Sequence, residues 1–126
     1  MKKKPPVKPI TWPKGSDGDI LASAAGRRAG EFSAEQLHVM IAHGDRLNEA
    51  IPSALDMLES EPFIEAGNYP GDLLAMVLLA RPGFWKENAG LYQRCARLIE
   101  NLRRGMGRIE EAAKSFESPA SSPWHP

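Results

Sequence analysis

The clearest pattern of apolar and polar positions begins at Ser33, after which apolar residues recur at helical spacing as far as Gly44. Ser33 and Gln36 have the spacing of a capping box, in which each side chain binds the backbone N–H of the other residue. Phe32 stands directly before Ser33, where a hydrophobic staple would lie. The pattern predicts a helix that starts after Ser33 and stops at Gly44.

A second apolar stripe predicts another helix, which ends before Pro62. The stripe consists of Ile51, Ala54, Leu55 and Leu58. Pro52 falls within this pattern, and proline has no N–H to donate, so it is well tolerated only in the first turn. We therefore expect this helix to begin shortly before Pro52.

A run that is apolar at almost every position, residues 72–80, lies between two Pro-Gly pairs. A helix that is apolar all round has to be buried on every side, so this segment predicts a central, buried helix. Asp72 stands at its start, where a carboxylate caps the helix and favours its dipole. One short helical turn is expected over residues 84–88.

The last helical pattern begins near Ala89 or Gly90 and continues to Ala113. Gly105 and Gly107 interrupt it, and each costs about 1 kcal/mol relative to alanine inside a helix. We expect the helix to persist across both glycines, with a kink or fraying near Gly105.

No segment alternates apolar and polar residues with the period of a strand. These patterns predict an all-α protein, a single small bundle of about five helices with a buried central helix, over residues 31–116. Residues 1–30, which begin with a stretch rich in lysine and proline, are expected to be a mostly extended or disordered head, in which residues 20–25 could form one or two helical turns. Residues 117–126 are expected to be a disordered tail.

The formal net charge of zero conceals an uneven distribution along the chain. Residues 31–91 carry ten acidic and three basic residues, whereas residues 92–114 carry six basic and three acidic ones. An acidic surface of this kind repels nucleic acid and attracts a basic partner, although it is also compatible with an ordinary solvated surface.

Residues with catalytic or metal-binding potential are few and poorly spaced. His38 and His43 are five positions apart on one predicted helix, whereas two metal ligands on one helix face are usually four apart. Cys95, the one cysteine, falls on an apolar stripe and is interpreted as a core residue. We therefore expect no catalytic site, no metal and no cofactor.

Nothing in the chain reads as a membrane segment or a signal peptide. The apolar runs are too short to span a bilayer, and prolines follow the initial lysines where a signal peptide would have an apolar segment. A lone cysteine is typical of a reducing compartment, so we expect a cytoplasmic protein.

The segment Asn68-Tyr69-Pro70-Gly71-Asp72-Leu73-Leu74, followed by Val77-Leu78, Pro82 and Phe84-Trp85, resembles the immunity proteins of contact-dependent growth inhibition systems. The resemblance covers roughly residues 50–102. It departs from the expected pattern at Ala89-Gly90, where a proline is expected near the start of the last helix.

The resemblance implies a protein without activity of its own that binds and neutralises the C-terminal toxin domain of a surface-delivered effector. Such toxins are often nucleases or other enzymes with basic clefts, which an acidic surface would attract. Four acidic residues lie off the apolar stripe of the second helix, and two aromatic residues flank the predicted central helix. The expected contact residues are therefore Asp56, Glu59, Glu61, Glu65, Tyr69 and Trp85.

The alternative is a small helical regulator that binds nucleic acid through the basic last helix and the lysine-rich head. The modest positive charge and the acidic segment argue against it.

Overall fold

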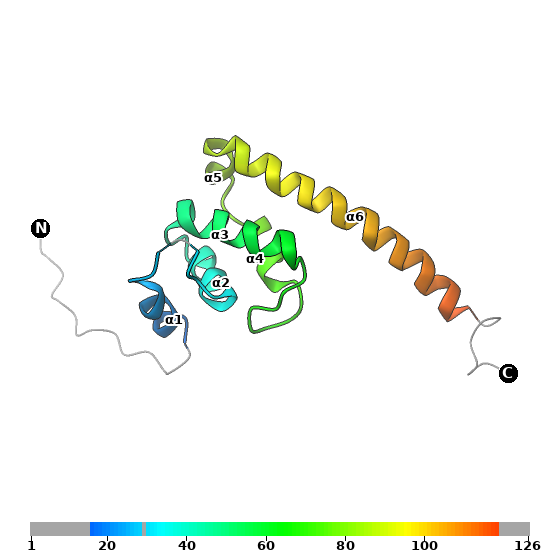
Figure 1. Ribbon diagram of the computed structural model, residues 1–126, viewed down its shortest axis with the longest axis horizontal. Helices are drawn as coiled ribbons and strands as arrows, with labels where there is room; N and C mark the ends of the chain where they lie inside the picture. The colour runs from blue at the N-terminus through cyan, green and yellow to red at the C-terminus, as the bar shows by residue number, and fades with distance from the viewer. Residues whose placement is uncertain (1–15, 29, 119–126) are drawn as a thin grey trace, which may run out of the picture. The chain divides into compact units, whose positions relative to one another are not determined.

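The computed structural model describes residues 16–28 and 30–118, and this part of the chain is mostly helical with no strand. Its helices are α1 (Asp17–Ala24), α2 (Ala34–Ala42), α3 (Leu47–Ser60), α4 (Asp72–Leu78), α5 (Pro82–Glu87) and α6 (Ala89–Glu117) (Figure 1). The predicted all-α class is confirmed. Helix α1 lies in the predicted head, over the part for which the sequence allowed one or two helical turns. Residues 1–15 and 29 of that head and residues 119–126 of the tail are outside the described residues.

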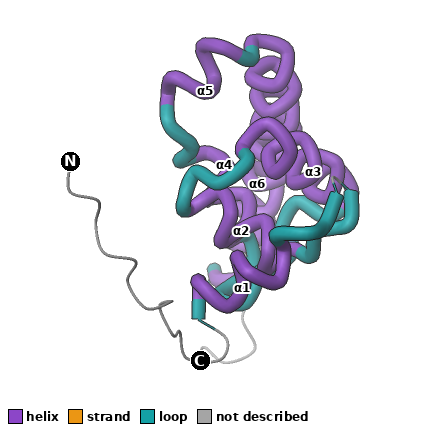
Figure 2. The backbone as a smooth tube through the Cα atoms, turned by 90° about the vertical axis from the view of Figure 1, so that its left-hand side faces the viewer, coloured by secondary structure: helices purple, strands orange, loops and turns teal. Residues whose placement is uncertain are grey.

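The chain divides into two compact units, one ending at Phe84 and the other beginning at Trp85. In the first unit α2 packs against α1, α3 and α4, so α2 is the central helix (Figure 2). Its Leu37 and Met40 are fully buried together with Ile51 and Leu55 of α3. The sequence had placed α4 in this central position, and that prediction is wrong.

Helix α4 is buried on one side only. Leu73 and Val77, one helical turn apart, are completely buried, whereas Leu78 and Leu79 are 47% and 76% exposed. The helix packs against α2 and α3 and presents its opposite side outward. The prediction of burial on every side is therefore wrong, because an uninterrupted apolar run does not reveal how many neighbours a helix has.

The limits of α2 agree with the sequence. The Ser33 Oγ accepts from the Gln36 N–H at 3.1 Å and the Gln36 side chain accepts from the Ser33 N–H at 2.8 Å, which confirms the capping box. Gly44 adopts a φ of +69°, and the next N–H, that of Asp45, donates to the Met40 carbonyl at 2.8 Å. This left-handed turn closes the helix in the way that glycine permits at low cost.

Helix α3 begins earlier than predicted. Its first residue is Leu47, so Pro52 lies in the helix interior rather than in the first turn. Proline there removes a backbone hydrogen bond and crowds the preceding turn. Leu47, Ala50 and Ile51 are all buried, and we infer that their burial holds the helix together through this position.

The second unit consists mainly of α6, which starts at Ala89 as predicted. It runs across Gly105 and Gly107 to Glu117, which confirms that the helix persists through both glycines, but the expected kink or fraying near Gly105 is absent (Figure 1). The Trp85 ring lies edge-on against the Tyr92 ring, with centroids 6.1 Å apart.

Candidate functional site

The outer side of α3 and the loop that follows it form an acidic surface. Residues 56–72 contain five acidic residues and neither lysine nor arginine. Four of them, Asp56 and Glu59 on α3, Glu61 at its C-terminal end and Glu65 in the loop, have exposed side chains. The opposite side of α3 carries the buried residues Ala54, Leu55 and Leu58. The structure thus brings the four predicted carboxylates onto one stretch of the first unit.

The loop between α3 and α4 has a defined shape. Glu65 and Pro70 form an isolated antiparallel bridge, and the Gly71 N–H donates to the Phe63 carbonyl at 3.1 Å. Gly71 adopts a φ of +94°, and an added Cβ there would lie 3.4 Å from the Phe63 ring. A φ of this sign strains residues that carry a Cβ, so glycine at position 71 permits the turn at low cost.

The Asp72 side chain holds this loop in place through hydrogen bonds to its backbone. The side chain is buried, with Oδ1 accepting from the Ala66 N–H at 2.6 Å and Oδ2 from the Asn68 N–H at 3.0 Å. Asp72 is the first residue of α4, and the N-cap position is held by Gly71, without a side-chain cap. The predicted capping role is therefore wrong: the carboxylate binds backbone donors of the loop instead.

The hydrogen bonds to Asp72 also determine its ionisation. Burial acts to raise the pKa of this carboxyl group, but the backbone N–H groups of Ala66, Asn68 and Tyr69, with a smaller contribution from His38, outweigh burial and hold the pKa below its usual value. Asp72 is therefore ionised at neutral pH, as its role as a double acceptor requires.

The lowered pKa of Asp72 predicts acid sensitivity. A carboxyl group with a lower pKa in the folded state stabilises the protein above its unfolded pKa, about 3.9, and this stabilisation is lost as the pH falls through the folded value. We expect the free energy of unfolding, measured by urea titration, to decline below about pH 4. The decline should be shallower in Asp72→Asn; equal declines in the two proteins would contradict the prediction.

The aromatic residues near the loop divide into exposed and buried members. Tyr69 and Phe63 are 55% and 50% exposed, whereas Phe84 is buried. The exposed ring of Tyr69 is therefore available as an anchor for a partner. Trp85 begins the second unit, where it contacts Tyr92. The contact roles of Tyr69 and Trp85 remain predictions.

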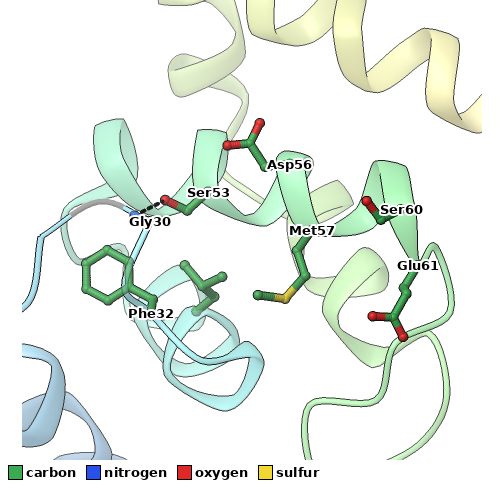
Figure 3. Close-up of a pocket in the computed structure, with 8 residues that line it drawn as sticks. Gly30, Phe32, Ser53, Asp56, Met57, Ser60 and Glu61 are labelled. Atoms are coloured by element: carbon green, nitrogen blue, oxygen red, sulfur yellow. Dashed lines mark hydrogen bonds between the residues drawn. The ribbon is translucent and has the colours of Figure 1, made fainter.

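A surface cavity of about 360 Å³ lies beside the acidic residues of α3 (Figure 3). Its lining comprises Gly30, Phe32, Leu37, Ser53, Asp56, Met57, Ser60 and Glu61. The Gly30 N–H donates to the Ser53 Oγ at 3.3 Å, which joins the segment before α2 to α3 at the edge of the cavity. The sequence pattern did not predict this cavity, because its lining comes from two segments that are distant in the sequence, such as Gly30 and Ser53.

Arg46 organises the region next to the cavity. Its guanidinium lies 5.1 Å from the centroid of the Phe32 ring, pairs with Glu49 at 2.6 Å, and donates to the carbonyls of Ala24 and Arg27. Arg46 thereby connects the end of α1 and the turn after it to the start of α3. In the sequence, these contacts of Arg46 are indicated only by Glu49, which lies three positions after it and can form an ion pair with it on a helix.

Groups suited to metal binding or nucleophilic chemistry are sparse in the described residues. No cluster of histidine, cysteine, aspartate and glutamate there could hold a metal ion. His43 pairs with Asp17 at 3.0 Å, and burial raises the pKa of the Cys95 thiol, which disfavours the reactive thiolate. None of the helices within residues 16–28 and 30–118 combines the length and apolarity needed to cross a membrane.

Comparison with known proteins gives one finding. The model of a protein family described as CDI immunity proteins matches residues 17–95, which include α1 to α5, the cavity and the acidic surface. No curated protein and no solved structure matches the chain.

Proposed function

Because the chain belongs to the family of CDI immunity proteins, whose general role is to neutralise toxins of contact-dependent growth inhibition, we propose that it binds one cognate toxin domain through the acidic surface of α3 and the α3–α4 loop. The observation that carries this proposal is the run of exposed carboxylates on a stretch without any basic residue. The protein acts by binding alone, in the cytoplasm, and has no catalytic activity.

The charge of this surface defines the kind of partner. Four exposed carboxylates and the absence of lysine and arginine over residues 56–72 create a negative potential that accelerates association with a basic surface. A toxin that acts on nucleic acid needs a basic cleft. We propose that the toxin partner is basic, and a nuclease is the activity that fits best.

The exposed aromatic rings complement the carboxylates. Tyrosine is enriched among the residues that contribute most to binding energy, because it buries a large area and loses little conformational freedom. Tyr69 is more than half exposed and stands on a loop whose shape Asp72 fixes. It provides the apolar centre of the contact, and the acidic residues provide its charged rim.

Charge reversal tests this surface. We expect Glu59→Lys/Glu61→Lys to weaken binding of a purified toxin domain by about 10–100-fold at low salt, with most of the change in the association rate. The control is Glu110→Lys/Glu111→Lys, the same change in charge on the exposed part of α6. Both affinities are measured by surface plasmon resonance over a range of salt concentrations, and urea unfolding verifies that both variants are folded.

Toxin domains for this measurement come from co-expression with candidate contact-dependent growth inhibition toxins, scored by survival of the host cells. Equal toxin binding by the wild-type chain and the Glu59/Glu61 variant would contradict the proposal that the acidic surface binds the toxin. A chain that rescues no toxin but binds random DNA in a salt-dependent manner would instead support the nucleic-acid regulator.

A further inference from the structure

We propose that the C-terminal half of α6 pairs with the same helix of a second copy of the chain, in antiparallel orientation. The pairing surface lies between Leu102 and Phe116, within a helix that Figure 1 shows to be continuous. The surface proposed to bind the toxin lies in residues 56–72, so this inference does not depend on the proposed function.

An apolar stripe of α6 continues beyond the part of the helix that is buried. Apolar or small residues recur at alternating steps of four and three positions, the heptad spacing of a coiled coil, at Leu91, Cys95, Leu98, Leu102, Gly105, Ile109, Ala112 and Phe116. Cys95 and Leu98 are buried, whereas Ile109 and Phe116 are 66% and 71% exposed. Met106, which lies beside the stripe, is also exposed. The second half of the stripe is therefore an apolar surface suited to a partner helix.

Large and small residues alternate along this exposed half. When Leu102 lies opposite Ala112 of an antiparallel second copy, Ile109 lies opposite Gly105. Each layer then combines one large and one small side chain, so the two helices fit closely without an overfilled layer. The space beside Gly105 is open in the described part of the chain, so an isoleucine from the second copy can enter it.

The charges on the flanks select this register. Arg103, Arg104, Glu110 and Glu111 are all exposed. In the antiparallel pair centred on Gly107, the two arginines of each copy lie alongside the two glutamates of the other copy. A shift by one heptad brings either the glutamates or the arginines of the two copies together, and a parallel pair in register does both.

Two arginines of α6 have further neighbours in this arrangement. The Arg104 Nη2 donates to the Asn101 Oδ1 at 2.6 Å, and the guanidinium has other N–H groups for a carboxylate. The Arg108 side chains of the two copies come near each other at the centre of the pair. Glu111 lies three positions further along the same helix and offsets their repulsion.

Sedimentation equilibrium of the full chain tests the pairing without any toxin. We expect the wild type to dimerise at submillimolar concentrations. Ile109→Gln should weaken the dimer at least about tenfold, because each dimer loses two buried isoleucines. The matched control is Leu79→Gln, the same kind of change at a residue of the first unit that is 76% exposed, and it should leave the dimer unchanged.

Circular dichroism verifies that both variants keep their helix content. A wild-type chain that stays monomeric at millimolar concentration would overturn the proposal and leave this face of α6 to the toxin or to another part of the same chain. A dimer that Ile109→Gln leaves intact would overturn it equally. Toxin affinity is measured separately, at concentrations at which the chain is monomeric, so the failure of one proposal is distinguished from the failure of the other.

Charge exchanges test the orientation. Arg103→Glu/Arg104→Glu makes all four flanking positions acidic, and Glu110→Arg/Glu111→Arg makes them all basic, so each should weaken the dimer at least about tenfold. The fourfold variant that combines both exchanges restores opposite charges across an antiparallel pair and should dimerise within about threefold of the wild type. Unchanged dimers in the two double variants, or no recovery in the fourfold variant, would overturn the antiparallel pairing.

Discussion

Replacing Asp72 by asparagine is expected to lower the free energy of unfolding by about 2–4 kcal/mol at neutral pH. The carboxylate accepts from the N–H groups of Ala66 and Asn68 through separate oxygens. Asparagine has a single oxygen, so its NH₂ group would face one of these donors and leave it unpaired in a buried site. The measurement is urea unfolding monitored by circular dichroism.

The matched control for Asp72→Asn is Glu65→Gln, the same chemical change at an exposed loop position. It should alter the stability by no more than about 0.5 kcal/mol. If Asp72→Asn proved as stable as the wild type, the carboxylate would not be what holds the loop. The same variant should also bind toxin more weakly, because the surface that carries Tyr69 loses its fixed shape.

The second large effect is expected on α4, where Leu73→Ala should lower the free energy of unfolding by about 2–5 kcal/mol. Leu73 is fully buried, so truncation leaves a cavity among its neighbours. Leu79, at the end of the same helix, is 76% exposed, and Leu79→Ala should change the stability by less than about 0.5 kcal/mol. Both values come from urea titrations under identical conditions.

The comparison between the two leucines tests the one-sided burial of α4 directly. A fully enclosed helix would show large losses at both positions, whereas a helix packed on one side loses stability at Leu73 only. Similar losses for the two variants would show that the exposed side of α4 is covered in solution.

Features that depend on neighbouring residues were predictable from the sequence. The capping box of Ser33 and Gln36 and the turn at Gly44 involve hydrogen bonds within a few residues, so their chemistry can be read locally. The exposure of the acidic side chains could also be predicted, because Glu59 and Glu61 lie off an apolar stripe that is visible in the sequence.

Features that depend on distant contacts were not predictable. Asp72 at a helix start reads as a cap, and only the folded loop shows that its oxygens bind the N–H groups of Ala66 and Asn68. Arg46, the N-cap residue of α3, donates from its guanidinium to carbonyls about twenty positions earlier. The cavity likewise requires Phe32 to meet α3, a contact that no local pattern encodes.

The way Asp72 holds the loop has an evolutionary consequence. The carboxylate accepts hydrogen bonds from backbone N–H groups, which every residue except proline provides. The side chains at Glu65, Asn68 and Tyr69 can therefore be replaced without loss of the hydrogen bonds that hold the loop. Gly67 and Gly71 cannot be replaced without strain, because their φ angles are +118° and +94°. Under the proposed function, a lineage that meets a new toxin can change the side chains of the proposed contact surface while the scaffold stays the same.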